Sequence, residues 1–179
     1  MVRAAPTAAD RRHRELVRFA THEAGHAVIA RVLTMVGFSA TIKSDVGRDG
    51  SPMSAHTAME HPWGCEREWQ LRGKVRSANA KFHASIIADM AGREAEVEIL
   101  GARRSGRGTD SRDRRHIISI ARGCLALGPA QWPRIEARFR AMTRMLIRRH
   151  RDRIERVADA LLVDGTLSGE QIDKLVGRS

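Results

Sequence analysis

The segment THEAGHAVIA at residues 21–30 restricts the fold more than any other part of the chain, because it places two histidines inside an apolar helical pattern. Apolar residues recur at helical spacing on both sides of it and predict a helix over residues 10–36, with Asp10 as its cap. On a helix, His22 and His26 project from the same face, one turn apart. The glycine between them costs about 1 kcal/mol relative to alanine, so we expect another segment or a substrate to approach closely there.

This spacing indicates a metal site. Both imidazoles can give a ring nitrogen to one ion, whereas Glu23 lies close to that ion but out of line with His22 and His26. Zinc lowers the pKa of bound water toward neutrality, and a nearby carboxylate can then take the proton. Two histidines without partners would be costly to bury in an apolar helix. The pattern therefore predicts a catalytic zinc site with Glu23 as general base.

A third ligand has to come from elsewhere in the chain. The residues after His26 read AVIARV, which excludes the third histidine of an HExxHxxGxxH site, and residues 37–57 contain no glutamate. The acidic residues that remain in good helical context are Glu94, Glu96, Asp110 and Asp113.

The remaining patterns predict a mainly α fold with a small β-hairpin. We expect a flexible tail over residues 1–9 and a single domain over residues 10–179. The hairpin is expected at residues 38–44 and 52–57, around the VGRDG turn, where it could pair with an extended substrate or simply cover the core. Further helices are expected at about residues 66–77, 79–100, 112–127 and 133–163, followed by a short one capped by Ser168.

The composition favours an aliphatic core and a cytoplasmic protein. Aromatic residues make up 4% of the chain and tyrosine is absent. No apolar stretch approaches the roughly 20 residues of a membrane span, and the N-terminus lacks the apolar region of a signal peptide. Cys65 and Cys124 lack metal-binding spacing, which is typical of a reduced compartment.

The net charge of +11 comes almost entirely from arginine. Such a charge can attract nucleic acid or anionic surfaces. However, the arginines are spread along the whole chain, and no aromatic residues alternate with them to stack on bases. A nucleic-acid partner is therefore the less favoured interpretation.

Four segments, in order, resemble the peptidase domain of the FtsH-type ATP-dependent zinc metalloprotease family. THEAGHAVIA resembles the zinc-site helix of that family, and MAGREAEVEILG resembles its GGRAAEE-type helix. GTDSRDRRHIISIAR resembles a later helix that opens with an aspartate, and LLVDGTLSGEQIDKL resembles the closing segment. The four segments extend from residue 21 to residue 175, and four ordered matches are far more specific than HExxH alone.

The resemblance implies a zincin-like fold and a zinc-dependent endopeptidase, with His22, His26 and an aspartate as ligands and Glu23 as general base. Counting back from the IAR segment of the later helix identifies the aspartate as Asp113. The preceding loop is one residue longer than in the family, which leaves Asp110 as the alternative. His116 and Glu96 are less favoured as ligands. Glu96 matches a family glutamate, and we expect it to orient a ligand histidine.

The chain also departs from the family. Ala91 replaces the first glycine of the GG pair, and the family's membrane helices and ATPase module have no counterpart in this sequence. We therefore expect a stand-alone peptidase-like domain that cuts flexible or unfolded polypeptides, or one that a separate ATPase or adaptor supplies with substrate. Two other functions stay open, a catalytically degenerate, zinc-containing protein-interaction domain and an arginine-rich nucleic-acid-binding accessory protein.

Overall fold

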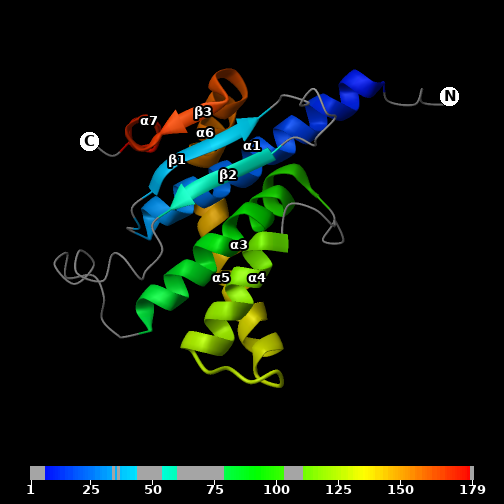
Figure 1. Ribbon diagram of the computed structural model, residues 1–179. Helices are drawn as coiled ribbons and strands as arrows, with labels where there is room; N and C mark the ends of the chain where they lie inside the picture. Colours follow the sequence, from blue (N-terminus) through cyan, green and yellow to red (C-terminus); the bar gives the residue numbers. More distant parts are fainter. Residues whose placement is uncertain are drawn as a thin grey trace.

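The computed structural model describes residues 7–33, 35, 37–43, 54–59, 79–102 and 111–177. Over these residues the protein is mainly helical, with one small antiparallel sheet, as Figure 1 shows. The elements in chain order are α1 (Ala8–Val32), β1 (Gly37–Lys43), β2 (Ser54–Met59), α3 (Ala80–Leu100), α4 (Ser111–Ser119), the π-helix η1 (Ile120–Cys124), α5 (Trp132–Arg149), α6 (Arg151–Asp164), β3 (Thr166–Ser168) and α7 (Gly169–Leu175). The expected mainly α fold with a β-hairpin is confirmed.

Helix α1 is the centre of the fold. Thr7 is its N-cap and forms a capping box with Asp10, so the prediction that Asp10 itself is the cap is wrong. The helix ends at Val32, short of the predicted residue 36. Every residue from Ala20 to Arg31 is buried, because α3, α6 and the sheet all pack around this half of the helix.

Gly25 allows α3 to pack directly on α1. A Cβ at Gly25 would lie 2.7 Å from the carbonyl oxygen of Ala91 and 2.8 Å from the Cβ of Ala95, which real side chains do not tolerate. The close approach that we expected at this glycine is thus made by the backbone of α3. It holds α3 against the turn of α1 that carries both histidines of the HEAGH segment.

The sheet has the strand order β2-β1-β3. The predicted hairpin is confirmed with shifted ends, and Thr41 of β1 lies opposite His56 of β2. Strand β3 was not predicted, because it has only three residues and the last of them, Ser168, is also the N-cap of α7. The sheet lies along α1, and β2 is an outer strand of the described sheet (Figure 1).

Two predicted helices are interrupted. The helix expected over residues 133–163 is two helices separated by His150, whose φ of −114° and ψ of 19° are not helical. The break lets α5 pack on α3 while α6 packs on α1. The helix expected over residues 112–127 is α4 followed by the π-helix η1. Helical periodicity continues through both interruptions, which is why the sequence alone did not show them.

The core is aliphatic, as the composition predicts. Its largest fully buried apolar side chains are Ile29, Ile86, Met90, Ile147, Ile154, Leu161, Leu167 and Ile172. Within the described part of the chain, no helix combines the length and the apolar character needed to cross a bilayer. The helix expected at residues 66–77, and Asp110, lie outside the described residues.

Candidate metal centre

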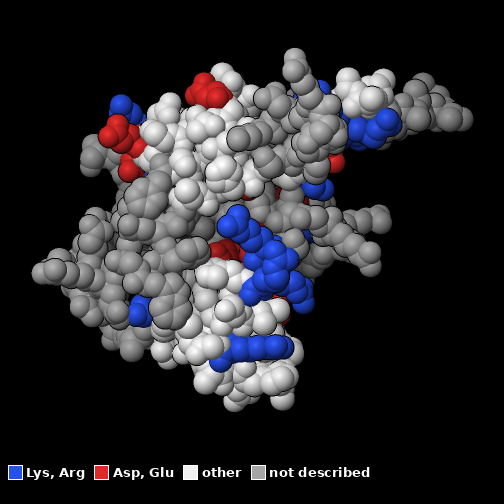
Figure 2. All heavy atoms as spheres, viewed as in Figure 1, with Lys and Arg blue, Asp and Glu red and all other residues white. Residues whose placement is uncertain are grey.

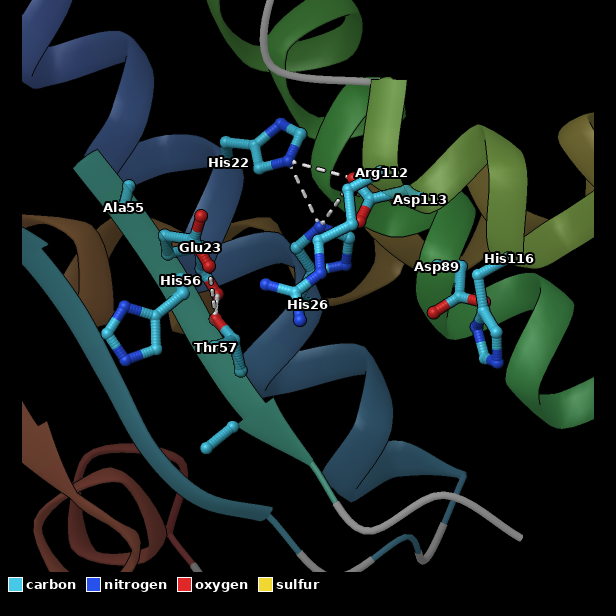
Figure 3. A pocket seen from close by; sticks show the side chains of 11 residues that line it. His22, Glu23, His26, Ala55, His56, Thr57, Asp89, Arg112, Asp113 and His116 are labelled. Atoms are coloured by element: carbon cyan, nitrogen blue, oxygen red, sulfur yellow. Dashed lines mark hydrogen bonds and ion pairs between the residues drawn. The ribbon is translucent and has the colours of Figure 1, made fainter. Parts of the chain in front are cut away.

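Two histidines of α1 form one side of the centre. His22 and His26 lie one turn apart, and each is less than 5% exposed. Their Nε2 atoms are 3.1 Å apart, and their rings meet edge to face with 4.7 Å between centroids. Both ring edges therefore point toward the same position, as Figure 3 shows.

Asp113 completes the centre from α4. Its Oδ2 atom lies 3.2 Å from Nε2 of His22 and 3.4 Å from Nε2 of His26. Within the described ranges these three residues are the group whose ligand atoms lie close enough together to hold one metal ion. Two imidazoles and one carboxylate are the ligand set of many catalytic zinc sites. The structure thus brings together the three residues that the resemblance implied.

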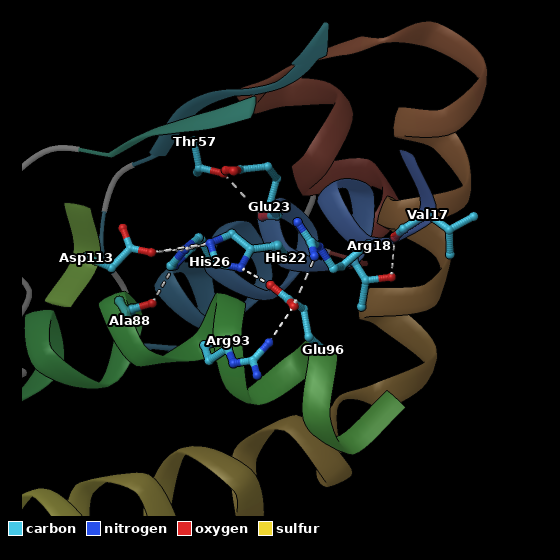
Figure 4. A network of polar contacts seen from close by, with 11 residues as sticks. Val17, Arg18, His22, Glu23, His26, Thr57, Ala88, Arg93, Glu96 and Asp113 are labelled. Atoms are coloured by element: carbon cyan, nitrogen blue, oxygen red, sulfur yellow. Dashed lines mark hydrogen bonds and ion pairs between the residues drawn. The ribbon is translucent and has the colours of Figure 1, made fainter. Parts of the chain in front are cut away.

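The opposite ring nitrogens fix the orientation of both imidazoles (Figure 4). Nδ1 of His22 donates to Oε1 of Glu96 over 2.8 Å, and Nδ1 of His26 donates to the carbonyl oxygen of Ala88 over 2.7 Å. A carbonyl and an ionised carboxylate can only accept, so both Nδ1 atoms carry the hydrogen. Arg93 in turn donates to Oε2 of Glu96 over 2.7 Å. Glu96 therefore orients His22, one of the three residues that could hold an ion.

This arrangement suits a cation. Neutral imidazoles with hydrogen on Nδ1 would direct two Nε2 lone pairs and a carboxylate at one point. When no ion is bound, a proton can take the same place. Burial acts to lower the pKa of His26, but the hydrogen bond to Asp113, the negative charges of Asp113 and Glu23 and the hydrogen bond to the carbonyl of Ala88 together raise that pKa to about 10. Burial likewise acts to raise the pKa of Asp113, yet the hydrogen bonds from both histidines hold that pKa well below its usual range. The centre thus strongly favours positive charge at its middle.

Gly92 on α3 leaves room for the two rings. A Cβ at this position would overlap Nε2 of His26 and lie 2.7 Å from Nε2 of His22. Helix α3 therefore carries Gly92 opposite the ring edges of the two histidines, although glycine lowers helix propensity. This role of Gly92 was not predicted from the sequence, although a glycine in the middle of a strong helical pattern was a usable signal.

Glu23 lines the cavity that borders the centre, and its side chain is largely buried, with 4% of it exposed. Its Oε2 atom accepts a hydrogen bond of 2.5 Å from the hydroxyl of Thr57 on β2. The same hydroxyl oxygen lies 3.2 Å from the backbone carbonyl oxygen of Glu23. The sheet thus positions the predicted general base, a contact that needs the packing of β2 on α1 and could not be read from the sequence.

A cavity of about 530 Å³ opens above the centre. Figure 3 shows β2 on one side of it and α4 on the other. His22, Glu23, His26 and Asp113 line it together with residues 55–58 of β2 and with Asp89, Arg112 and His116. Its volume lies in the range of small-molecule and peptide side-chain sites.

The less favoured ligands have other partners. Nδ1 of His116 lies 2.6 Å from Oδ2 of Asp89, on the far side of the cavity in Figure 3. Glu96 contacts the Nδ1 side of His22 and not the side where a metal would bind. Glu94, the remaining candidate, binds Arg140 and Arg144 of α5 at 2.7 Å each. Asp113 is therefore the carboxylate that the described part of the chain offers to both histidines.

No protein-family model matches the chain, and no curated protein matches it.

Proposed function

We propose that this protein is a zinc-dependent endopeptidase that hydrolyses peptide bonds in flexible or unfolded polypeptides. The observation that carries the proposal is the convergence of His22, His26 and Asp113 beside Glu23 at the floor of an open cavity. His22 and His26 come from α1 and Asp113 comes from α4, and buried hydrogen-bond partners hold the orientation of both histidines. The resemblance of four ordered segments to FtsH-type peptidases supports the same reaction.

In this mechanism, His22, His26 and Asp113 would hold the zinc ion. Bound zinc supplies a Lewis acid that makes water more acidic and polarises the substrate carbonyl. Glu23 takes a proton from the attacking water and passes it to the leaving amine. Thr57 keeps the carboxylate of Glu23 on the cavity side of α1.

The outer edge of β2 is the proposed place for the substrate backbone. Residues 55–58 of this strand line the cavity, and β2 pairs with β1 through its other edge. An extended peptide could add to the sheet there by backbone hydrogen bonds. Its scissile carbonyl would then lie over the metal centre.

The test is cleavage of a reduced, carboxymethylated and fluorescently labelled protein by zinc-loaded enzyme. We expect turnover that a chelator abolishes, and that the Glu23→Gln variant lacks while it retains zinc. Glu170→Gln is the matched control, because Glu170 is exposed on α7, away from the cavity. Equal turnover in Glu23→Gln would overturn the mechanism. Stoichiometric zinc with no turnover in the wild type would instead favour the degenerate, protein-binding alternative.

A further inference from the structure

Helix α4, which forms one wall of the cavity, carries three exposed arginines. Figure 2 shows Lys and Arg side chains gathered where α4 lies in Figure 1. Arg112, Arg114 and Arg115 of this helix are all exposed, but Arg112 is the one that lines the cavity. Figure 3 shows its side chain extending from α4 toward β2. It therefore lies on the side of the centre that a substrate would enter.

Other arginines of the fold are bound to carboxylates of the chain. Arg93 binds Glu96, Arg144 binds Glu94 and Arg148 binds Glu98, all at 2.7 Å. For Arg112, as for Arg114 and Arg115, no carboxylate of the described ranges is recorded within ion-pair distance, and of these three arginines Arg112 is the one in the cavity lining.

The acidic groups that line the cavity are already engaged. Glu23 accepts from Thr57, Asp113 contacts both histidines, and Asp89 contacts His116. Among the described residues, none of these carboxylates forms an ion pair with Arg112, which leaves its exposed guanidinium accessible to an anionic ligand. A guanidinium can bind a carboxylate through two parallel hydrogen bonds, which makes it a selective partner for that group.

We propose that Arg112 is a specificity-determining residue that binds a carboxylate of the substrate peptide close to the scissile bond. This inference rests on the proposed peptidase function. The carboxylate can come from an aspartate or glutamate side chain or from the C-terminus of the peptide. The net charge of +11 adds a long-range attraction for acidic polypeptides. Nucleic acid is disfavoured, because the described lining contains no Phe or Trp on which bases could stack.

The binding test uses zinc-loaded Glu23→Gln protein, so that peptides are not consumed. Three fluorescent peptides share one neutral sequence. The first peptide is capped at both ends and contains one glutamate. The second peptide is also capped at both ends and has glutamine in place of the glutamate, so it is the neutral reference. The third peptide has the same glutamine but a free C-terminal carboxylate. Fluorescence anisotropy at about 0.15 M salt gives each Kd. We expect one of the carboxylate peptides to bind about tenfold more tightly than the neutral peptide, and which one it is identifies the source of the carboxylate.

Arg112→Gln should remove this preference, whereas Arg115→Gln, which takes the same charge from the same helix outside the cavity, should keep it. Equal Kd values for all three peptides, or equal losses in both variants, would overturn the inference. So would tight binding of duplex DNA that displaces the peptides and weakens equally in both variants. Thermal unfolding confirms that each variant is folded.

Cleavage by the wild type separates this inference from the proposed function. Chelator-sensitive cleavage with no preference for acidic peptides would overturn the role of Arg112 and leave the peptidase standing. Binding of a carboxylate peptide that depends on Arg112, without any cleavage, would support the subsite and overturn the peptidase.

Discussion

Oε1 of Glu96 accepts a hydrogen bond of 2.8 Å from Nδ1 of His22, although the two residues are 74 positions apart. The contact joins α3 to α1 and leaves Nε2 of His22 facing Asp113. Because Glu96 is fully buried, its second oxygen needs a partner too, and Arg93 supplies it. A buried ion pair thus fixes the direction in which His22, a candidate metal ligand, points.

Replacing this glutamate should weaken zinc binding. Glu96→Gln keeps an acceptor for His22 but removes the charge, and we expect zinc affinity to fall about 10- to 100-fold. Competition with a zinc-sensitive dye measures it. Glu98→Gln is the control, because Glu98 lies on the same helix as Glu96 but pairs with the exposed Arg148 of α5. Unchanged affinity in Glu96→Gln would show that the contact does not support the metal site.

Asp113 should be required for zinc, and Asp89 should not. Both aspartates line the cavity, but only Asp113 contacts the histidine Nε2 atoms. We expect Asp113→Ala to lose stoichiometric zinc and with it the rise in melting temperature that zinc gives the wild type. Asp89→Ala should retain both. Elemental analysis and thermal unfolding with and without zinc measure the two effects, and a zinc-loaded Asp113→Ala protein would contradict the assignment.

Gly92→Ala tests the space in front of the two imidazoles. Alanine favours a helix by about 1 kcal/mol over glycine, but here its Cβ would displace both rings. We expect a net loss of about 1–3 kcal/mol of stability from overpacking and a loss of zinc binding. Gly123→Ala is the control, because nothing lies within 4 Å of the Cβ that it would add. Chemical denaturation and zinc titration measure the outcome, and normal zinc binding by Gly92→Ala would refute the steric argument.

Thr57→Val should reduce activity without removing zinc. The substitution keeps the shape of the side chain but removes the hydrogen bond to Glu23, which is worth about 1 kcal/mol. We therefore expect kcat/KM to fall roughly fivefold with the metal content unchanged. Thr41→Val on β1 removes a hydroxyl that pairs with Thr166, outside the cavity, and should leave kcat/KM unchanged. Equal activity in both variants would mean that Thr57 does not position Glu23.

His116 should titrate at a higher pH than an ordinary histidine. Its hydrogen bond to Asp89 raises its pKa, burial opposes the shift, Asp113 adds to it and Arg112 opposes it. A folded-state pKa above about 6.5 means that protonation stabilises the fold. The stabilisation is complete below the unfolded-state pKa of about 6.5, and it is lost as the pH rises through the higher folded-state pKa.

Nuclear magnetic resonance titration of the histidine signals measures this pKa, and His116→Gln identifies the signal. Asp89→Asn should lower the midpoint, because the neutral amide no longer favours the imidazolium. An unchanged midpoint in Asp89→Asn would contradict the assigned cause.

Features set by local spacing were predictable from the sequence. The shared face of His22 and His26 follows from helix geometry alone, and the close approach at Gly25 follows from the rarity of glycine in helices. The capped helix α7 was predicted from the reciprocal signals of Ser168 and Gln171, and the structure confirms its capping box. These features depend on residues within about one turn of each other.

Features set by contacts between distant segments were not predictable in the same way. Spacing alone left four acidic candidates for the third ligand, and only the resemblance singled out Asp113. The contact between Thr57 and Glu23 depends on the register of β2 and on its packing against α1. Strand β3 exists because β1 supplies hydrogen-bond partners to its three residues, which have no strong pattern of their own.

Two candidate ligands of the metal centre, His22 in α1 and Asp113 in α4, are 91 residues apart in the chain. A bound ion would therefore act as a reversible cross-link that closes a long loop and restricts the unfolded chain. Removing it should loosen the end of α4 that carries Asp113 before it disturbs the tightly packed contact between α1 and α3. Amide hydrogen exchange in the metal-free protein should accordingly accelerate first in α4, so that metal supply would control whether the cavity wall is assembled at all.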